Sequence, residues 1–124
     1  MLKGIGIDIV ELSRIEEANQ KYGDRFLNRI YTEHELAYCN SREATKFKHL
    51  AARFAAKEAC SKAMGTGIAR GVSWKDMEIQ NLFSGEPIMK LYGKALEICQ
   101  GLIIHVSLTH TNTNAAAVVV LEQL

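Results

Sequence analysis

One alanine-rich segment constrains the fold of this chain more than any other feature. Residues 44–64 read ATKFKHLAARFAAKEACSKAM, and alanine is the strongest helix former. The GTG that follows begins with Gly65, which suits the left-handed conformation that closes many helices. The segment therefore predicts a helix over residues 44–64, the longest element of the chain.

Shorter elements are expected on both sides of this helix. Residues 4–10, GIGIDIV, strictly alternate, with isoleucines on one face and glycines, Asp8 and Val10 on the other, which predicts a strand. Capping-box spacings predict helices from Ser13 to about Tyr22 and from Thr32 to about Asn40. The remaining predictions are strands at KDMEIQNL and PIMKLY around an FSGEP turn, a helix over Gly93 to Gln100, and strands at IIHVSLTHT and AAAVVVLE around an NTN turn.

The last of these strands is continuously apolar, so we expect it to be covered on both faces. Strands thus lie at both ends of the chain, and helices cluster in its first half. The sequence therefore predicts an α+β fold.

Size, charge and cysteine content limit the class of protein. At 124 residues we expect one domain, residues 1–124, with a single hydrophobic core. A net charge of +1 gives no support to nucleic-acid binding by bulk electrostatics. No apolar run approaches the roughly 20 residues that span a bilayer, and MLKGIGIDIVEL carries acidic residues that a signal peptide lacks. With three cysteines and no C-x-x-C pair, we expect a cytoplasmic protein without a membrane or nucleic-acid partner.

Glu58 is the unusual residue of the long helix. It belongs to one stripe of positions spaced three or four apart, namely Phe47, Ala51, Phe54, Glu58, Ser61 and Gly65. A buried carboxylate costs several kcal/mol, or a large upward pKa shift, unless a cation, a metal or hydrogen-bond donors compensate it. An ion pair with Lys62, one turn later, is one explanation, and a bound metal ion is another.

Asp8 raises the same question in the first strand. Its face otherwise carries Gly4 and Gly6, whose missing side chains let another element or a ligand approach closely. Capping of the following helix is the alternative role for Asp8. Taken together, Asp8 and Glu58 suit magnesium, which binds one or two carboxylates along with waters and substrate phosphates.

Basic residues crowd the same region. Between Arg42 and Lys75 there are eight Lys or Arg against two acidic residues, which indicates a localised anionic partner, with a solvated surface as the alternative. Arg53, Lys57 and Lys62 border the carboxylate stripe and favour a phosphate-bearing ligand. The GTG turn belongs to no Walker or G-x-G-x-x-G pattern, so a P-loop or dinucleotide fold is excluded.

The strand near the C-terminus carries a second polar group of side chains. His105, Ser107 and Thr109 alternate with apolar residues and therefore share one face. That face could hold phosphate oxygens, and a solvent-facing polar edge is the alternative. The histidines and cysteines have no paired short spacing, so the sequence gives no zinc signal.

The segments GIGIDIVELSRIE, RFAAKEACSKAMGTGI and HVSLTHTNTNAAAVVVLE occur in this order and spacing in one known family. The chain resembles the holo-acyl-carrier-protein synthase type of 4'-phosphopantetheinyl transferase over essentially its whole length. The central motif K-E-x-x-x-K-A-x-G-T-G-I is the most specific part of the likeness. Two departures, SLTH for the commoner SLSH and Gly6 where many members have a larger residue, do not indicate an inactive protein.

The resemblance implies a small antiparallel sheet with a long central helix and shorter helices, assembled as a homotrimer with active sites between subunits. The implied reaction moves the 4'-phosphopantetheine arm from coenzyme A to a serine of apo acyl carrier protein, for fatty acid biosynthesis, and releases adenosine 3',5'-bisphosphate. Magnesium is implied at Asp8 and Glu58. The positions that match the coenzyme A site are Arg53, Lys57, Ser61, Lys62, Gly65, Gly67, His105, Ser107 and Thr109.

The residues leave the general base open between neutral Lys57, Glu58 acting through a metal-bound water, and a water held by Asp8. Acyl carrier proteins are acidic, and in this family they dock on the first helix. We therefore expect Arg14, with Lys21 and Arg25, to bind the carrier. The rival hypothesis is a trimeric module that binds the carrier or coenzyme A without transfer; Asp8 and Glu58 favour the enzyme, because a binding module would not need inward carboxylates.

Overall fold

The computed structural model describes residues 1–124. The chain forms five strands, five α-helices and two short 3-10 turns. In chain order they are β1 (Leu2–Glu11), α1 (Leu12–Tyr22), α2 (Asp24–Ile30), α3 (Glu33–Asn40), η1 (Glu43–Thr45), α4 (Lys46–Met64), η2 (Trp74–Asp76), β2 (Met77–Asn81), β3 (Pro87–Leu91), α5 (Gly93–Ile98), β4 (Ile103–His110) and β5 (Asn114–Glu122). The predicted α+β class, with a small antiparallel sheet and a long central helix, is confirmed.

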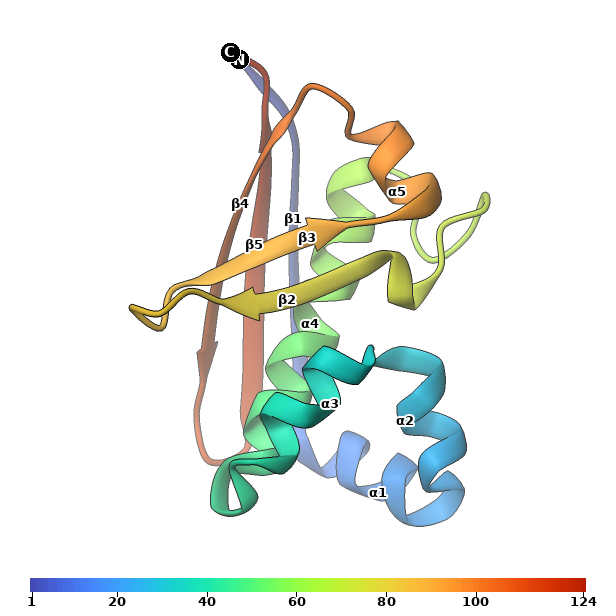
Figure 1. The fold of residues 1–124 in the computed structure, drawn as a ribbon, viewed down its shortest axis with the longest axis vertical. Coiled ribbons are helices and arrows are strands. Elements are labelled where there is room, and N and C mark those ends of the chain that lie inside the picture. Colours follow the sequence, from blue (N-terminus) through green and yellow to red (C-terminus); the bar gives the residue numbers. More distant parts are fainter.

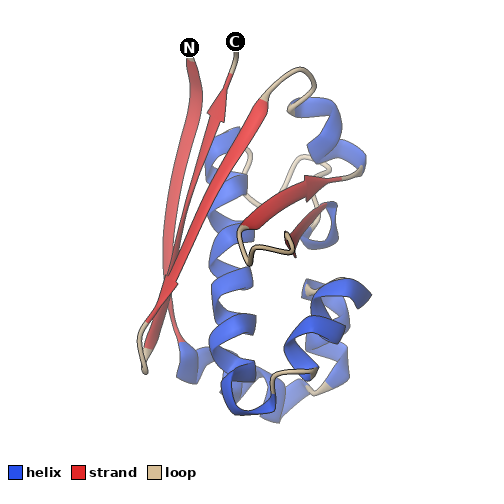
Figure 2. Cartoon of the chain, turned by 60° about the vertical axis from the view of Figure 1, so that its left-hand side comes forward, coloured by secondary structure: helices blue, strands red, loops and turns tan.

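Helix α4 lies at the centre of the fold. On one side it packs against an antiparallel three-stranded sheet in the order β1-β5-β4, and on the other against β2 of the β2–β3 hairpin and against helices α1 and α3 (Figures 1 and 2). Its buried residues are Leu50, Ala51, Ala52, Arg53, Ala55, Ala56, Lys57, Ala59, Cys60, Ser61 and Ala63. Short alanine side chains let elements approach from nearly every direction, which explains why the helix is so rich in alanine.

Glycines allow the closest of these approaches, between β1 and α4. A Cβ atom placed on Gly6 would lie 1.9 Å from the carbonyl oxygen of Ala59, and one on Gly4 would lie 2.1 Å from that of Ala63. Any larger residue would push the strand off the helix. The expectation that another element lies against the bare face of this strand is confirmed.

The predicted C-terminal end of α4 and the predicted start of α3 also hold, whereas α4 begins at Lys46, two residues after the predicted start, behind η1. Gly65 adopts a left-handed conformation with φ 78° and ψ 6°, and its amide donates to the carbonyl oxygen of Lys62. The side chain of Thr32 accepts from the amide of Glu35, and that of Glu35 accepts from the amide of Thr32, so the predicted capping box is formed.

Other parts of the structure differ from the sequence predictions. The capping box expected at Ser13 is wrong, because β1 runs directly into α1 at Leu12, whose amide donates to the carbonyl oxygen of Thr113. Helix α2 was not predicted; Gly23, with φ 56°, ends α1 and begins α2 at once. Helix α5 ends at Ile98, before Gln100.

The sheet is covered on one face only. Alternate residues of β5 from Ala115 to Leu121 are buried against α4, whereas Val118 and Val120 are half-exposed. On β1 the side chains of Ile5, Ile7 and Ile9 are 65%, 68% and 68% exposed. The expectation that β5 is covered on both faces is therefore not met within one chain. We call this second side, with Ile5, Ile7, Ile9, His105, Ser107, Thr109, Ala116, Val118 and Val120, the outer sheet face.

None of the helices combines the length and the apolar character that crossing a membrane requires.

Candidate active site

Two carboxylates, Asp8 and Glu58, lie where β1 packs on α4, and together with Lys62 we call them the inner site. Asp8 lies on the inner side of β1, on the same face as the buried Gly6 and Val10, and Glu58 lies on the flank of α4. Burial raises the pKa of Glu58 above its ordinary value, the charge of Asp8 raises it further, and Lys62 opposes both. Asp8 lies 3.1 Å from the ammonium of Lys62, which follows Glu58 by one turn of α4, so the two acidic groups lie on the same side of the helix although they are far apart in the sequence.

Lys62 completes this group of charges. Its ammonium lies 3.1 Å from Oδ1 of Asp8 and donates to the carbonyl oxygen of Ile7, also at 3.1 Å. The side chain of Lys62 remains 51% exposed. An ion pair between Lys62 and Glu58 was one explanation for the carboxylate in the helix stripe, but in the structure Lys62 pairs with Asp8.

The donor set decides which metal could be held. No group of three or more His, Cys, Asp or Glu side chains is placed to bind an ion. Two half-buried carboxylates that repel each other are too few to surround a metal ion with protein ligands alone. They suit magnesium, which keeps several waters and also binds substrate phosphates. Asp8 and Glu58 therefore fit the magnesium ion that the sequence predicts.

Lys57 lies elsewhere. It is 0% exposed, and its ammonium is 2.7 Å from Oε1 of Glu35 and donates to the carbonyl oxygens of Trp74 and Met77. Burial lowers the pKa of Lys57, and Glu35 opposes this by favouring the charged form. Neutral Lys57 was one of three candidates for the general base; in this structure its ammonium is instead bound by Glu35 and by the carbonyl oxygens of Trp74 and Met77.

Arg53 and Ser61, also predicted to line the coenzyme A site, are buried as well. Arg53 is 2% exposed; its guanidinium donates to Oδ1 of Asn81 at 2.7 Å and lies 4.3 Å from the centre of the Tyr38 ring. The hydroxyl of Ser61 donates to the carbonyl oxygen of Glu58 at 2.7 Å. Of the α4 side chains predicted to contact coenzyme A, Lys62 alone is exposed to solvent.

The turn after α4 is open. A Cβ atom on Gly65 or Gly67 would meet no atom within 4 Å, and both glycines have positive φ. The amides of Thr66 and Gly67 both donate to the carbonyl oxygen of Ser61, so this turn is fixed to the end of the helix. The turn therefore leaves space for a ligand beside Lys62.

The predicted residues of β4 lie on the far side of the sheet. His105, Ser107 and Thr109 are exposed on the outer sheet face, and the Nε2 atom of His105 is 3.0 Å from Oε1 of Glu122. A shallow hollow of about 150 Å³ lies there between Ile7, Ser107 and Val118. Within one chain, these side chains therefore lie on the opposite face of the sheet from Asp8.

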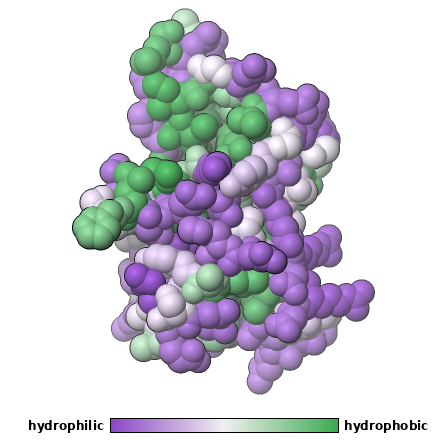
Figure 3. All heavy atoms as spheres, viewed as in Figure 1, coloured by the Kyte–Doolittle hydropathy of each residue, from purple (hydrophilic) through white to green (hydrophobic).

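The basic residues predicted to bind a carrier lie together on α1 and α2. Arg14, Lys21 and Arg25 are exposed, and hydrophilic side chains cover much of the surface over these helices (Figure 3). Arg25 lines a hollow of about 420 Å³ together with Tyr22 and Arg29. Arg29 was not among the predicted carrier-binding residues, although its spacing of four from Arg25 places it on the same side of α2.

Glu35 and Glu78 are further charged groups that the sequence reasoning did not single out. Both are buried, and Glu78 accepts hydrogen bonds from Thr32, Gln80 and Tyr92. Glu35 forms the predicted capping box, and in addition its carboxylate pairs with the ammonium of Lys57, which the capping pattern does not indicate.

The fold, a long helix against a small antiparallel sheet, is shared with solved holo-[acyl-carrier-protein] synthases. The family model described as the 4'-phosphopantetheinyl transferase superfamily matches residues 4–119. The chain belongs to this superfamily, and within it to the family of the holo-[acyl-carrier-protein] synthases. The resemblance drawn from the sequence is confirmed.

Individual relatives give the extent of the likeness. The chain is 50% identical to the holo-[acyl-carrier-protein] synthase of Koribacter versatilis, covering 98% of this chain and 99% of that protein. It is 42% identical to the synthase of Bacillus anthracis, solved in complex with CoA (3',5'-ADP), with a TM-score of 0.85, and covers 99% of it. The Helicobacter pylori synthase, solved in complex with coenzyme A, is 33% identical with a TM-score of 0.86; the match covers 95% of this chain and 99% of that one.

Proposed function

We propose that this chain is a holo-acyl-carrier-protein synthase. It transfers the 4'-phosphopantetheine group from coenzyme A to a serine hydroxyl of apo acyl carrier protein, in support of fatty acid biosynthesis, and releases adenosine 3',5'-bisphosphate. Full-length similarity to synthases, two of them solved with coenzyme A or its nucleotide portion, supports this activity. The observation that carries it is the position of Lys62, which lies 3.1 Å from Oδ1 of Asp8 and one turn along α4 from Glu58.

Asp8 and Glu58 are the residues that would hold magnesium in this enzyme. When bound, the ion supplies positive charge that offsets the charge of the pyrophosphate during phosphoryl transfer. The half-buried carboxylates and their mutual repulsion support this assignment, since a divalent cation relieves the repulsion.

The chain's own groups have separate tasks around this ion. The side chain of Lys62 is 51% exposed, so its ammonium can also bind a phosphate oxygen of the substrate. The open turn at Gly65 and Gly67 lets the phosphates lie against the backbone. With the ammonium of Lys57 bound by Glu35, Trp74 and Met77, Asp8 and Glu58 remain the candidates to accept the proton of the serine, each through a water.

The complete site requires more than one copy of the chain. Arg53, Lys57 and Ser61 are buried in one chain. The other predicted coenzyme A residues lie in two places: Lys62 and the turn at Gly65 and Gly67 are at the end of α4, and the β4 residues are on the outer sheet face. The outer sheet face also exposes Ile5, Ile7 and Ile9, which a second copy would cover. We therefore propose a homotrimer, in which each active site is built from the inner site of one subunit and the β4 strand of the next.

The partner surface follows from charge. Arg14, Lys21 and Arg25, joined by Arg29, offer a basic surface to an acidic carrier protein. As proposed, the whole chain acts as a single domain, residues 1–124, in the cytoplasm.

The activity is tested by mass spectrometry of the carrier. Apo carrier incubated with coenzyme A, magnesium and the protein should gain roughly 340 Da, the mass of the transferred arm. The matched controls omit magnesium or use Glu58→Gln, and both should remove most of the gain. If the carrier gains no mass where a known synthase modifies it, the rival hypothesis of a binding module is supported instead.

Sedimentation tests the assembly separately. A particle of three times 13.8 kDa is expected, and Ile7→Lys, which places a charge on the outer sheet face, should dissociate it. A 13.8 kDa particle for the unaltered chain would contradict the trimer.

A further inference from the structure

A pair of fully buried charges links three elements around α4. Lys57 of α4 and Glu35 of α3 are both 0% exposed, and their charged atoms lie 2.7 Å apart. Replacing such a pair by apolar residues is often neutral or stabilising, so stability alone does not account for it. The contacts of the pair suggest a different role.

The ammonium of Lys57 holds the backbone where β2 begins. Besides Glu35, its acceptors are the carbonyl oxygens of Trp74 and Met77, which stand at the two ends of η2. The indole ring of Trp74 also stacks on Phe54, with ring centres 4.9 Å apart. Lys57 is therefore the charged group that fixes η2 to the middle of α4.

Glu35 in turn fixes the ammonium. Its Oε1 atom accepts from the amide of Thr32 at 3.0 Å as well as from Lys57, and its Oε2 atom accepts from the amide of Ile79 at 2.9 Å. Both carboxylate oxygens are thus bound to backbone amides of α3 and β2. The carboxylate cannot turn away from Lys57 without losing these bonds.

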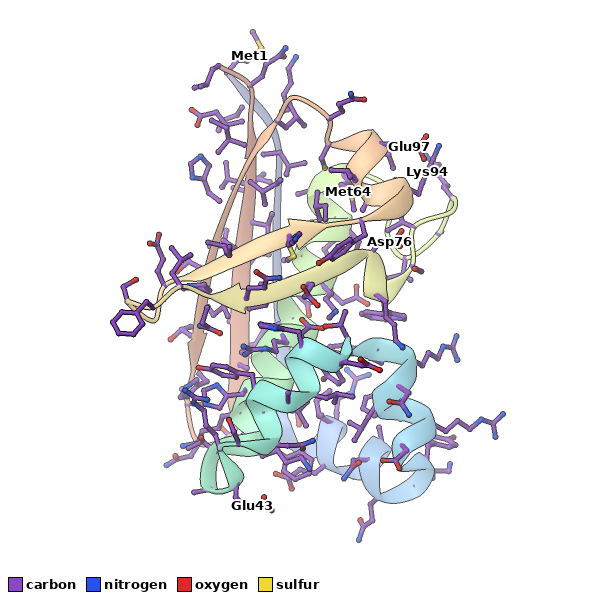
Figure 4. All side chains as sticks on the ribbon, viewed as in Figure 1. Met1, Glu43, Met64, Asp76, Lys94 and Glu97 are labelled. Atoms are coloured by element: carbon purple, nitrogen blue, oxygen red, sulfur yellow. The ribbon has the colours of Figure 1, made fainter.

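The segment fixed in this way is the far end of the loop over residues 65–73. Met64 ends α4 before the loop, and η2, which follows the loop, ends at Asp76 (Figure 4). The near end is held by the amides of Thr66 and Gly67, which donate to Ser61. Between them the backbone passes through left-handed conformations, including Arg70 with φ 58°. A loop of this kind keeps its shape only while both ends are held.

We propose that Lys57 is a positioning residue: Glu35 holds its ammonium, and the ammonium holds the far end of the loop 65–73 in the conformation that receives coenzyme A. This inference rests on the proposed function for the identity of the ligand. It assigns Lys57 no contact with substrate and no proton transfer, and it gives Glu35 a role in coenzyme A binding from a distance.

The test compares Lys57→Met with Lys75→Met, a control at an exposed lysine in the same segment. Lys57→Met should raise the KM for coenzyme A about fivefold or more while kcat stays within about twofold. The pH profile of kcat should keep its shape, because no proton-transferring group has been removed. Amide hydrogens of residues 66–76 should exchange faster than in the unaltered protein, and Lys75→Met should change none of these.

Other results overturn the proposal. A large loss of kcat, with one limb of the pH profile missing, would make Lys57 a catalytic residue. Lower overall stability with an unchanged KM and unchanged exchange in the loop would make the pair merely structural. Faster loop exchange with unchanged coenzyme A affinity would separate the loop from binding.

A second variant covers the case in which Lys57→Met fails to fold, since a single replacement leaves Glu35 buried and unpaired. Glu35→Gln with Lys57→Met removes both charges and should give the same loop exchange and the same rise in KM. Hydrogen exchange is measured without coenzyme A, so it decides whether Lys57 holds the loop even if the transferase activity itself is refuted.

Discussion

Gly6→Ala is the substitution that most sharply tests the packing behind the active site. The new Cβ atom would lie 1.9 Å from the carbonyl oxygen of Ala59 and 2.9 Å from the amide nitrogen of Ala63. Both are backbone atoms of α4, which is packed on nearly every side, so the clash cannot be relieved by a side-chain rotation. Strand β1 must therefore move away from the helix.

The expected cost lies at the upper end of the range for overpacked cores. Such substitutions cost about 1–3 kcal/mol, and a clash with buried backbone favours about 3 kcal/mol. For a chain of this size, that corresponds to a fall in Tm of about 10 °C. The displacement also moves Asp8, two residues along the strand, away from Glu58. Transferase activity should therefore fall by more than the loss of folded protein accounts for.

Urea denaturation and thermal melting measure this cost. Lys3→Ala, at an exposed position of the same strand, is the matched control and should stay within about 0.5 kcal/mol of the unaltered protein. If Gly6→Ala also stayed within about 1 kcal/mol, the close contact between β1 and α4 would be refuted, and with it the physical reason for glycine at this position.

Two further substitutions test the buried polar groups around α3. Thr32→Ala removes the N-cap of α3 and a hydrogen bond to Glu78, and should lower the free energy of unfolding by about 1–2 kcal/mol in urea; no change would contradict the capping box. Burial raises the pKa of Glu78, but hydrogen bonds from Thr32, Gln80 and Tyr92 outweigh it and hold that pKa below its ordinary value. The ionised carboxylate therefore contributes stability that is fully present above the unfolded pKa and is lost as the pH falls through the folded one. The unaltered protein should exceed Glu78→Gln in stability at neutral pH and lose this advantage below about pH 4.5, whereas a constant difference across that range would contradict the assignment.

Local sequence signals account for the parts of the fold that were predicted. Alanine content and Gly65 fix α4 and its end, and Thr32 with Glu35 fixes the start of α3, because each is decided by neighbouring residues. The capping box at Ser13 failed because the amide of Leu12 is satisfied by Thr113, a hundred residues away along the chain, which no local pattern reveals.

The site was predicted unevenly for a related reason. The bare face beside Asp8 is visible in the sequence, because glycines stand at alternate positions. Helical spacing put Glu58 in the buried stripe, yet its neighbour Lys57 is the charge that is fully buried. When a helix is surrounded on nearly all sides, periodicity no longer distinguishes an inner face from an outer one. The partner Glu35 was beyond prediction, since tertiary packing alone brings α3 to Lys57.

The central claim is that each active site joins the inner site of one subunit to the outer sheet face of another. Subunit mixing tests this claim most directly. Glu58→Gln damages the first half of the site and His105→Ala the second, so each variant alone should have little transferase activity. Trimers assembled from equal amounts of both should recover about a quarter of the unaltered activity, because one interface in four then unites two intact halves. Activity no greater than that of the two variants measured separately would place the whole site within one chain and contradict the account.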